Sequence, residues 1–457
     1  RQQHANDDAT LAKLPQLKLT DLPAQVDFHV ASPELLFGQQ ALISELPTNR
    51  ISYLDIGFDL SHVPTDYFPL LDLFGTITTE IGTSKLDYMQ FAKETATCTG
   101  GLNHSINTYT AYGEPDSVRP ILWINVKMLP EYLERGIDLL SQVFSDLSLR
   151  DRGRIAEIVR REFAWAEHST QSEGYGLAST RVFSHLSLAG RYQEAYSGVS
   201  AYRRLKELAL GYQGQEEAFL SALERLSELV LNRANMIISF TGEAQEIELF
   251  KSTGQRLVDA IADRPVSQAD ASPAPDFVRD EAFITAAEVV FAVQGGNLFE
   301  SGTGYKGSFE VLKTYLSRDY LWNSVRQIGG AYGCFIQFSS ITGNLAMISY
   351  RDPQVRKTYD AYDRLPEVVA EIDLSRQALE QLIIGTYGNF DPHQSAAAKG
   401  ATARNDYLCN ITPEHKRQRL QEITSTTVDD LRSFASGIRT MTDNRYRAII
   451  GNRAKIE

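Results

Sequence analysis

Residues 320–353 read YLWNSVRQIGGAYGCFIQFSSITGNLAMISYRDP, and the order of elements in this stretch recurs elsewhere in the chain. A helix is predicted to end at Arg326, and Gly329 and Gly330 then free the backbone for a turn. Two strands follow, CFIQFSS and LAMISYRD, with Tyr332 at the entry to the first. The stretch therefore predicts a helix, a glycine turn and two strands, in that order.

Arg326 and Tyr332 lie six positions apart across this turn, so their side chains can converge on one point. A guanidinium and a phenol are both hydrogen-bond donors, and together they suit a carbonyl oxygen that gains negative charge. The pattern also fits a structural role, in which Arg326 faces the negative end of the helix dipole and Tyr332 fills a strand edge. The two residues alone leave both interpretations open.

The same order of elements is predicted on both sides of an Ala/Pro/Ser-rich segment, SQADASPAPD, at residues 267–276. The later copy comprises a strand at 288–294, a helix at 308–325, the Gly329-Gly330 turn, two strands, several helices to about residue 436, and the strand YRAIIGN. The earlier copy comprises a strand at 51–60, a helix at 66–81 with Asp66 as its N-cap, the Gly100-Gly101 turn, the strands GLNHSINTYTAY and PILWINVKM, helices to about residue 232, and the strand MIISFTG. We therefore expect an α+β fold of two similar tandem domains, each with a mixed, largely antiparallel sheet packed with helices.

The predicted domain organisation follows from this repeat and from the polar, Pro-containing start of the chain. Residues 1–25 are interpreted as the end of a linker and residues 267–277 as a second linker. Residues 26–266 form the first α+β domain, and residues 278–457 form the second domain, which carries Arg326 and Tyr332.

Composition excludes several classes of function. The 457 residues include 45 Lys+Arg and 58 Asp+Glu, giving a net charge of −13, which argues against nucleic acid and would suit basic peptides. No apolar run approaches the ~20 residues of a membrane helix, and the N-terminal RQQHANDDAT lacks the apolar core of a signal peptide. Three cysteines make no disulfide framework. We therefore expect a soluble, intracellular protein of the cytoplasm or a mitochondrial-matrix-like compartment, not a secreted or membrane protein.

The sequence offers no metal or nucleotide motif of its own. None of the eight histidines pairs with another at the i, i+4 spacing of a zinc helix, and there is no CxxC. The GTGYKG at residues 302–307 matches G-x-G-x-x-G but lacks the strand directly before it and the acidic residue at the end of the next strand. We interpret these glycines as loop residues and expect no metal in this chain.

Several motifs together give the chain a family resemblance. They are TGGLNHSINTYT, GGN at residues 295–297, VRQIGGAYGCF, ISYRDP, and GNFDPHQSAAAKG before NITPEHKRQRLQEIT. In these the chain resembles the second half of the presequence protease branch of the pitrilysin/insulinase zinc metallopeptidases, over nearly its whole length. The resemblance implies a half-clamshell of two similar domains, LuxS/processing-peptidase-like in fold, joined to a first half. That half carries an inverted HxxEH zinc motif, with a further Glu as third ligand.

The resemblance also implies a site and a set of partners. Tyr332 would donate to the tetrahedral oxyanion, and Arg326 would hold a substrate carbonyl. Apart from the resemblance, we expect Gly329 and Gly330 to contact substrate. Zinc would be bound by the absent N-terminal half, because the helix that ends at Glu80 has only Leu73, Thr76 and Ile77 at the motif positions.

The implied activity is zinc-dependent endopeptidase degradation of unstructured oligopeptides inside a closed chamber. The partners would be the N-terminal half and peptide substrates, and this chain alone would be inactive. The alternative is a catalytically silent partner or scaffold subunit of the same superfamily.

Overall fold

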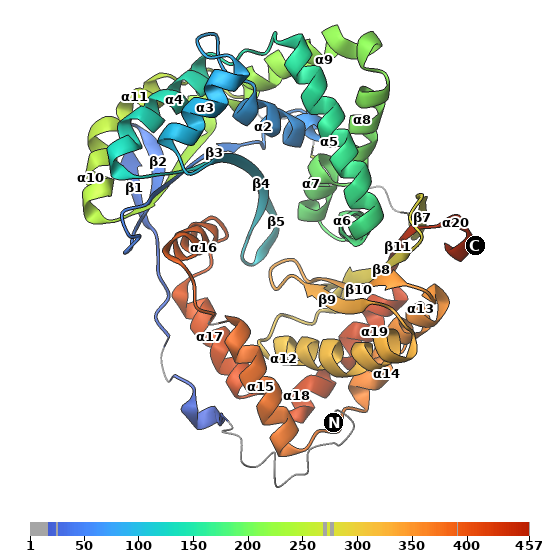
Figure 1. The fold of residues 1–457 in the computed structure, drawn as a ribbon. Helices are drawn as coiled ribbons and strands as arrows, with labels where there is room; N and C mark the ends of the chain where they lie inside the picture. The colour runs from blue at the N-terminus through green and yellow to red at the C-terminus, as the bar shows by residue number, and fades with distance from the viewer. Residues whose placement is uncertain (1–16, 24–25, 268–271, 275–277, 391, 457) are drawn as a thin grey trace, which may run out of the picture.

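The computed structural model describes residues 17–23, 26–267, 272–274, 278–390 and 392–456. Its strands form two sheets (Figure 1), one six-stranded in the order β1-β2-β6-β3-β5-β4 and one five-stranded in the order β7-β11-β8-β10-β9. The first sheet contains β1 (Ser32–Leu36), β2 (Gln39–Glu45), β3 (Ser52–Asp59), β4 (Leu102–Ala111), β5 (Glu114–Met128) and β6 (Met236–Gly242). The second contains β7 (Asp280–Ile284), β8 (Val290–Asn297), β9 (Gly333–Phe338), β10 (Asn344–Asp352) and β11 (Tyr446–Gly451).

Helices fill most of the chain between these strands. Up to β7 they are η1 (Leu19–Asp21), η2 (Thr65–Leu70), α2 (Leu71–Glu80), α3 (Tyr88–Cys98), η3 (Pro130–Tyr132), α4 (Leu133–Ser145), α5 (Arg152–Glu173), α6 (Tyr175–Ser184), α7 (Leu188–Ser197), α8 (Val199–Leu210), α9 (Tyr212–Val230), η4 (Arg233–Asn235), α10 (Ala244–Thr253) and α11 (Gln255–Asp259). After β8 they are η5 (Leu298–Ser301), α12 (Ser308–Tyr315), η6 (Leu316–Ile328), α13 (Val355–Asp363), α14 (Leu365–Ala370), α15 (Arg376–Phe390), α16 (Ala396–Leu408), α17 (Pro413–Thr424), α18 (Val428–Ser433), α19 (Ala435–Asp443) and α20 (Arg453–Ile456).

The two sheets repeat one topology. The order β2-β6-β3-β5-β4 in the first corresponds to β7-β11-β8-β10-β9 in the second. The first pair of this shared order is parallel in each sheet, β2 with β6 and β7 with β11, and the remaining pairs are antiparallel. This confirms the predicted fold class. The predicted order of elements lacks the first strands of each sheet, because the sequence patterns predict no strand at β1, β2 or β7.

The predicted domain boundaries stay a prediction. Most of the proposed linkers at 1–25 and 267–277 lies outside the described residues, which include only 17–23 of the first and residues 267 and 272–274 of the second. The strands of the first sheet come from residues 32–242 and those of the second from residues 280–451.

Two predicted helices and one strand differ from the structure. The helix expected at 66–81 is a 3-10 turn, η2, followed by α2, and Asp66 is not its N-cap, because Pro64 precedes the turn and Pro69 lies inside it. The helix expected at 308–325 is α12 followed by η6, a π-helix. The strand expected from residue 120 already begins at Glu114, so the turn between β4 and β5 is tighter than expected.

Each sheet is also covered by a helix from the half of the chain that forms the other sheet (Figure 1). Helix α16 packs Ala403 and Leu408 on the face of the first sheet that carries Trp123, and α6 packs Ala178 and Val182 on the second sheet. Two glycines from the conspicuous motifs permit these close approaches. A Cβ on Gly400 of α16 would lie 2.0 Å from Thr241 Oγ1, and one on Gly295 of β8 would lie 2.7 Å from Val182 Cγ1.

Polar contacts accompany both crossing helices. Arg404 of α16 donates to Asp55 of β3 at 2.5 Å and lies 4.2 Å from the centre of the Trp123 ring. Arg181 of α6 donates through Nε to Glu281 of β7 at 2.6 Å. The two sheets are therefore joined by apolar contacts and by charged hydrogen bonds.

Candidate functional site

Arg326 lies in the last turn of η6, and its guanidinium faces two aromatic rings. Its Cζ is 3.9 Å from the centre of the Trp322 ring and 6.0 Å from that of Tyr332. A π-helix is rare and concentrates at functional sites, and its wide turn sets the approach to Gly329, whose N–H donates to Ser324 O at 3.1 Å. Within the described part of the chain, Arg326 pairs with no carboxylate. Its donors are therefore free for a ligand.

Tyr332 directly precedes β9, and its side chain is 63% exposed. Its backbone N–H donates to Tyr350 O at 3.1 Å, and the two rings meet edge to face with their centres 5.4 Å apart. Among the described residues, no hydrogen bond uses its hydroxyl. The predicted convergence of Arg326 and Tyr332 is therefore present, and both side chains keep free donors.

Arg351 is a third cation at this point, and the sequence interpretation missed it. Its Cζ lies 5.6 Å from the centre of the Tyr332 ring and 5.2 Å from that of Tyr350. Its φ of +52° is unusual for a residue with a side chain, and it lies where the pairing of β10 with β8 shifts between Ser349 and Asp352. Such strained positions concentrate at functional sites. The SYRDP motif therefore forms the bulge that directs Arg351 toward Tyr332.

Hydrogen bonds tie this bulge to the glycine turn. Asp352 accepts from Gln354 N at 2.7 Å and from Thr358 Oγ1 at 2.6 Å, and Gln354 Nε2 donates to Gly329 O at 3.0 Å. Gly330 has a φ of +81°, and a Cβ on Gly329 would meet Val325 O at 2.4 Å. Both glycines are therefore required by the backbone. Their predicted contact with substrate stays a prediction.

The thiol nearest this site does not suit a nucleophile. Cys334 is the second residue of β9, and burial raises its pKa to about 11, although Arg326 acts in the opposite direction. At neutral pH the group is a protonated thiol, which is a weak nucleophile. The chemistry available from Arg326, Tyr332 and Arg351 is hydrogen bonding and positive charge, directed at an electron-rich oxygen.

The first sheet carries no copy of this pair. At the same offsets from Gly100-Gly101, the residues that correspond to Arg326 and Tyr332 are Thr97 and Asn103. Gly101 keeps the positive φ of Gly330, at +136°. The repeat therefore preserves the backbone of the turn but places the two donors in the second copy only.

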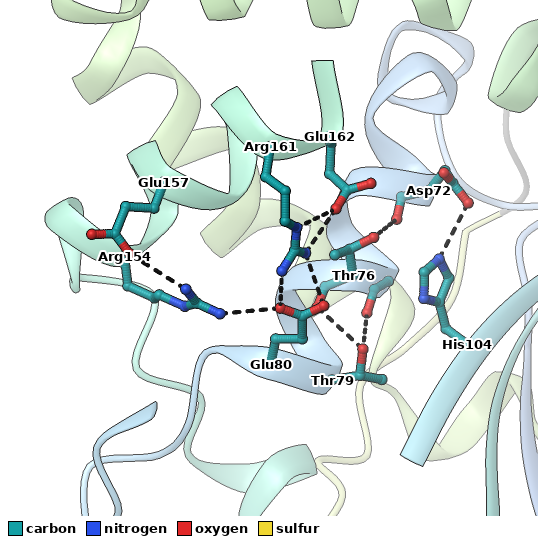
Figure 2. A network of polar contacts seen from close by, with 10 residues as sticks. Asp72, Thr76, Thr79, Glu80, His104, Arg154, Glu157, Arg161 and Glu162 are labelled. Atoms are coloured by element: carbon teal, nitrogen blue, oxygen red, sulfur yellow. Dashed lines mark hydrogen bonds and ion pairs between the residues drawn. The ribbon is translucent and has the colours of Figure 1, made fainter. Parts of the chain in front are cut away.

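The positions predicted to replace a metal motif lie on α2, of which Figure 2 labels Thr76. Leu73, Thr76 and Ile77 are buried there, and none is a zinc ligand. One turn later, Glu80 accepts from Arg161 at 2.7 and 2.8 Å and from Arg154 at 3.2 Å. Two guanidinium groups repel a cation, and among the described residues no cluster of three His, Cys, Asp or Glu side chains could hold a metal. These residues do not fit zinc.

Similarity to known families is spread over most of the chain. Residues 1–208 match the family of domains associated with subfamily C of the M16 peptidases, and residues 280–452 match the PreP C-terminal domain.

Within the described residues, no helix is both long enough and apolar enough to cross a bilayer.

Curated relatives match the chain from end to end. It is 28% identical over 457 residues to "Protein HypA" of Clostridium perfringens and 26% identical over 457 residues to "Presequence protease 1, chloroplastic/mitochondrial" of Arabidopsis thaliana. Each alignment includes 100% of this chain but only 47% and 42% of the relative. The chain therefore spans about half the length of these relatives.

Solved structures share the fold at low sequence identity. The inactive domain of a peptidase M16 from Pseudomonas fluorescens superposes with a TM-score of 0.65 at 12% identity, covering 92% of this chain and 98% of that one. A protease from Helicobacter pylori superposes with a TM-score of 0.62 at 14% identity, covering 93% and 100%. The chain belongs to the peptidase M16 (pitrilysin) superfamily and corresponds to the C-terminal half of its presequence protease-like members.

Proposed function

We propose that this chain is the C-terminal half of a zinc endopeptidase that degrades unstructured oligopeptides inside a closed chamber. It contributes the chamber wall and the donors Arg326 and Tyr332, whereas the metal and the attacking water belong to the N-terminal half. The observation that carries this proposal is that Arg326 and Tyr332 lie together and both keep free hydrogen-bond donors. Both groups are positioned by aromatic rings and by the glycine turn, and neither has a hydrogen-bonding partner of its own among the described residues.

In this proposal the two side chains divide the work on the scissile peptide. Arg326 holds a substrate carbonyl, and the Tyr332 hydroxyl donates to the carbonyl oxygen as it gains negative charge. Among the described strands, β9 is the edge of its sheet and pairs with β10 only, so an extended peptide can add beside Tyr332 through main-chain hydrogen bonds. The glycine turn, with Gly329 and Gly330, leaves the backbone open next to that peptide.

The substrate class follows from closure and charge. A closed chamber admits flexible peptides and excludes folded proteins and bulk water. The net charge of −13 favours basic peptides. The names of the relatives from Arabidopsis thaliana and Xenopus laevis place those proteins in chloroplasts or mitochondria, which supports an intracellular compartment for this one.

The second candidate is a silent scaffold subunit, and the free pair favours the active half. A scaffold needs neither an unpaired guanidinium nor an exposed phenol, and holding Arg351 at a φ of +52° costs about 1–3 kcal/mol.

Complementation separates the two candidates. This chain is mixed with the metal-bearing N-terminal half, and cleavage of an internally quenched basic peptide is followed beside each half alone. We expect cleavage only from the mixture, with a folded protein of the same composition spared. A complex that forms and binds peptide without cleaving it would support the scaffold instead.

A further inference from the structure

A second groove lies beside α2, apart from the Arg326/Tyr332 site. It has a volume of about 330 Å³ and runs between η2 and α2 on one side and α5, α7 and α8 on the other. Its apolar lining includes Leu70, Leu73, Trp165, Tyr196, Tyr202 and Leu205. Trp165 on α5 is 61% exposed, so much of this aromatic side chain is accessible to a ligand, although the Arg161 guanidinium lies 4.9 Å from the centre of its ring. Exposed aromatic surface next to a small apolar hollow is typical of a binding site.

The rim of this groove is acidic. Asp72 lines it with a side chain that is 64% exposed and that contacts His104 at 3.2 Å. Figure 2 shows the neighbouring charges of α2 and α5, in which Glu80, Glu157 and Glu162 share Arg154 and Arg161. Of these carboxylates, Asp72 and Glu162 line the groove itself, and Glu162 pairs with Arg161. The rim therefore favours a cationic ligand and disfavours an anionic one.

An open strand edge runs alongside the groove. In the part of the chain that the structure describes, β4 is the last strand of the first sheet and pairs with β5 only. Its residues 102–108 are partly or fully exposed. Two side chains of one face reach the groove's lining, because His104 contacts Asp72 and the Thr108 hydroxyl lies 3.2 Å from that of Tyr196. A chain added to this edge would direct every second side chain toward the groove.

We propose that the groove and the β4 edge form a noncatalytic docking site for an extended peptide, in which an apolar side chain enters the groove and a neighbouring Lys or Arg pairs with Asp72. This inference rests on the proposed function, because the occupant is a further stretch of the same flexible, basic substrate. The strand edge supplies the main-chain hydrogen bonds, the groove selects an apolar residue, and the rim selects positive charge. Such a site allows the chamber to hold a longer stretch of peptide and takes no part in the cleavage reaction.

Binding of a labelled peptide to this chain alone tests the site, because no cleavage is needed. The probe is a fluorescent ten-residue peptide in which every second residue is alternately Leu and Arg and the residues between them are Ser, so that Leu and Arg share one strand face; binding is followed by anisotropy. We expect Trp165→Ala to weaken binding about tenfold, as truncation of an aromatic anchor does, and Trp165→Phe to restore most of it. The matched control is Leu35→Ala, because Leu35 is 77% exposed on β1 at the opposite edge of the same sheet. That variant binds as the parent does.

Two further arms test the charge and the strand edge. Asp72→Asn and replacement of Arg by Gln in the peptide are expected to weaken binding by similar factors, and the two changes together no further than either alone. A peptide N-methylated at alternate residues is expected to bind more weakly, since it cannot complete the strand pairing. Unchanged affinity for Trp165→Ala and Asp72→Asn would overturn the docking site.

Other outcomes remain distinguishable. A chain that dimerises in light scattering, and that Trp165→Ala makes monomeric, would assign the groove to a second copy and overturn the peptide proposal. Failure of the docking site leaves the Arg326/Tyr332 proposal standing, because that proposal is tested by cleavage. Conversely, peptide binding at the groove with no cleavage in the complemented enzyme would overturn the proposed function and keep the docking site.

Discussion

The guanidinium carbon of Arg326 lies 3.9 Å from the centre of the Trp322 ring, one helical turn earlier. The contact belongs to a row of alternating rings and cations that continues through Tyr332 and Arg351 to Tyr350. Among the described residues, each cation contacts aromatic rings and pairs with no carboxylate, so its charge is available to a ligand. The row therefore positions the two proposed donors without neutralising them.

Removing the Trp322 ring should impair Arg326 without removing it. A cation–π contact contributes about 0.5–2 kcal/mol, so we expect Trp322→Ala to lower kcat/KM of the complemented enzyme about two- to thirtyfold. Trp322→Phe keeps a ring and should stay within about twofold of the parent. Equal rates for the Ala and Phe variants would show that the ring does not position Arg326.

Two substitutions of Arg351 should differ in their effect on stability but not in their effect on activity. Its φ of +52° suits glycine and strains any other residue. We therefore expect Arg351→Gly to be about 1 kcal/mol more stable than Arg351→Ala, measured by thermal unfolding. Both variants lack the cation over Tyr332 and should lose activity alike, about two- to fivefold in kcat/KM. Full activity in either variant would contradict a role for this guanidinium.

The contact between Arg404 and Asp55 predicts a dependence of stability on pH. Burial raises the pKa of Asp55 above its ordinary value, and Arg404 and Asn125 oppose the rise. A raised pKa in the folded state means that stability falls as pH rises from the ordinary Asp value toward the folded one. Arg404→Met removes the opposing cation and raises this pKa further, so the cost of ionised Asp55 grows.

We therefore expect Arg404→Met to lose about 2–3 kcal/mol of unfolding free energy at pH 7 and clearly less at pH 4. Urea unfolding at the two pH values measures this difference. Adding Asp55→Asn in the same chain should remove the pH dependence, since no carboxyl remains to titrate there. An equal loss at both pH values would mean that Arg404 acts through packing on Trp123 alone.

Metal removal should leave this chain unaffected. The guanidinium groups of Arg154 and Arg161 donate to Glu80 on α2, and no cluster among the described residues offers three metal ligands. We expect the thermal midpoint of the isolated chain to be the same with and without a chelator. Elemental analysis should find no stoichiometric zinc, and one zinc per chain would refute the assignment of the metal to the other half.

The repeat was predictable because its signals are local. Gly100-Gly101 and Gly329-Gly330 mark backbone turns that few other residues can form, and strands such as MIISFTG and LAMISYRD have unambiguous apolar patterns. The strand β7 was missed because it alternates between exposed and half-buried residues, so no continuous apolar run marks it. The π-helical form of η6 has no pattern of its own, since helices of different pitch use the same residue types.

The donors of the site were predictable, but their supports were not. Arg326 and Tyr332 flank a turn that the sequence displays, whereas Arg351 reaches Tyr332 only through a bulge in the next strand. Helix α16 crosses to the first sheet through long-range packing, which no local period encodes. Gly400 is conspicuous in its motif, but only the structure shows why glycine is needed there, because a Cβ would collide with Thr241.

The central claim is that the Tyr332 hydroxyl stabilises the oxyanion. Its test is kcat of the complemented enzyme on a quenched peptide, with Tyr332→Phe beside the parent and Tyr350→Phe as the matched control from the neighbouring ring. We expect a fall of about 10²–10³-fold in kcat for Tyr332→Phe, with little change for Tyr350→Phe and unchanged unfolding for both. A Tyr332→Phe enzyme that turns over as fast as the parent would contradict it.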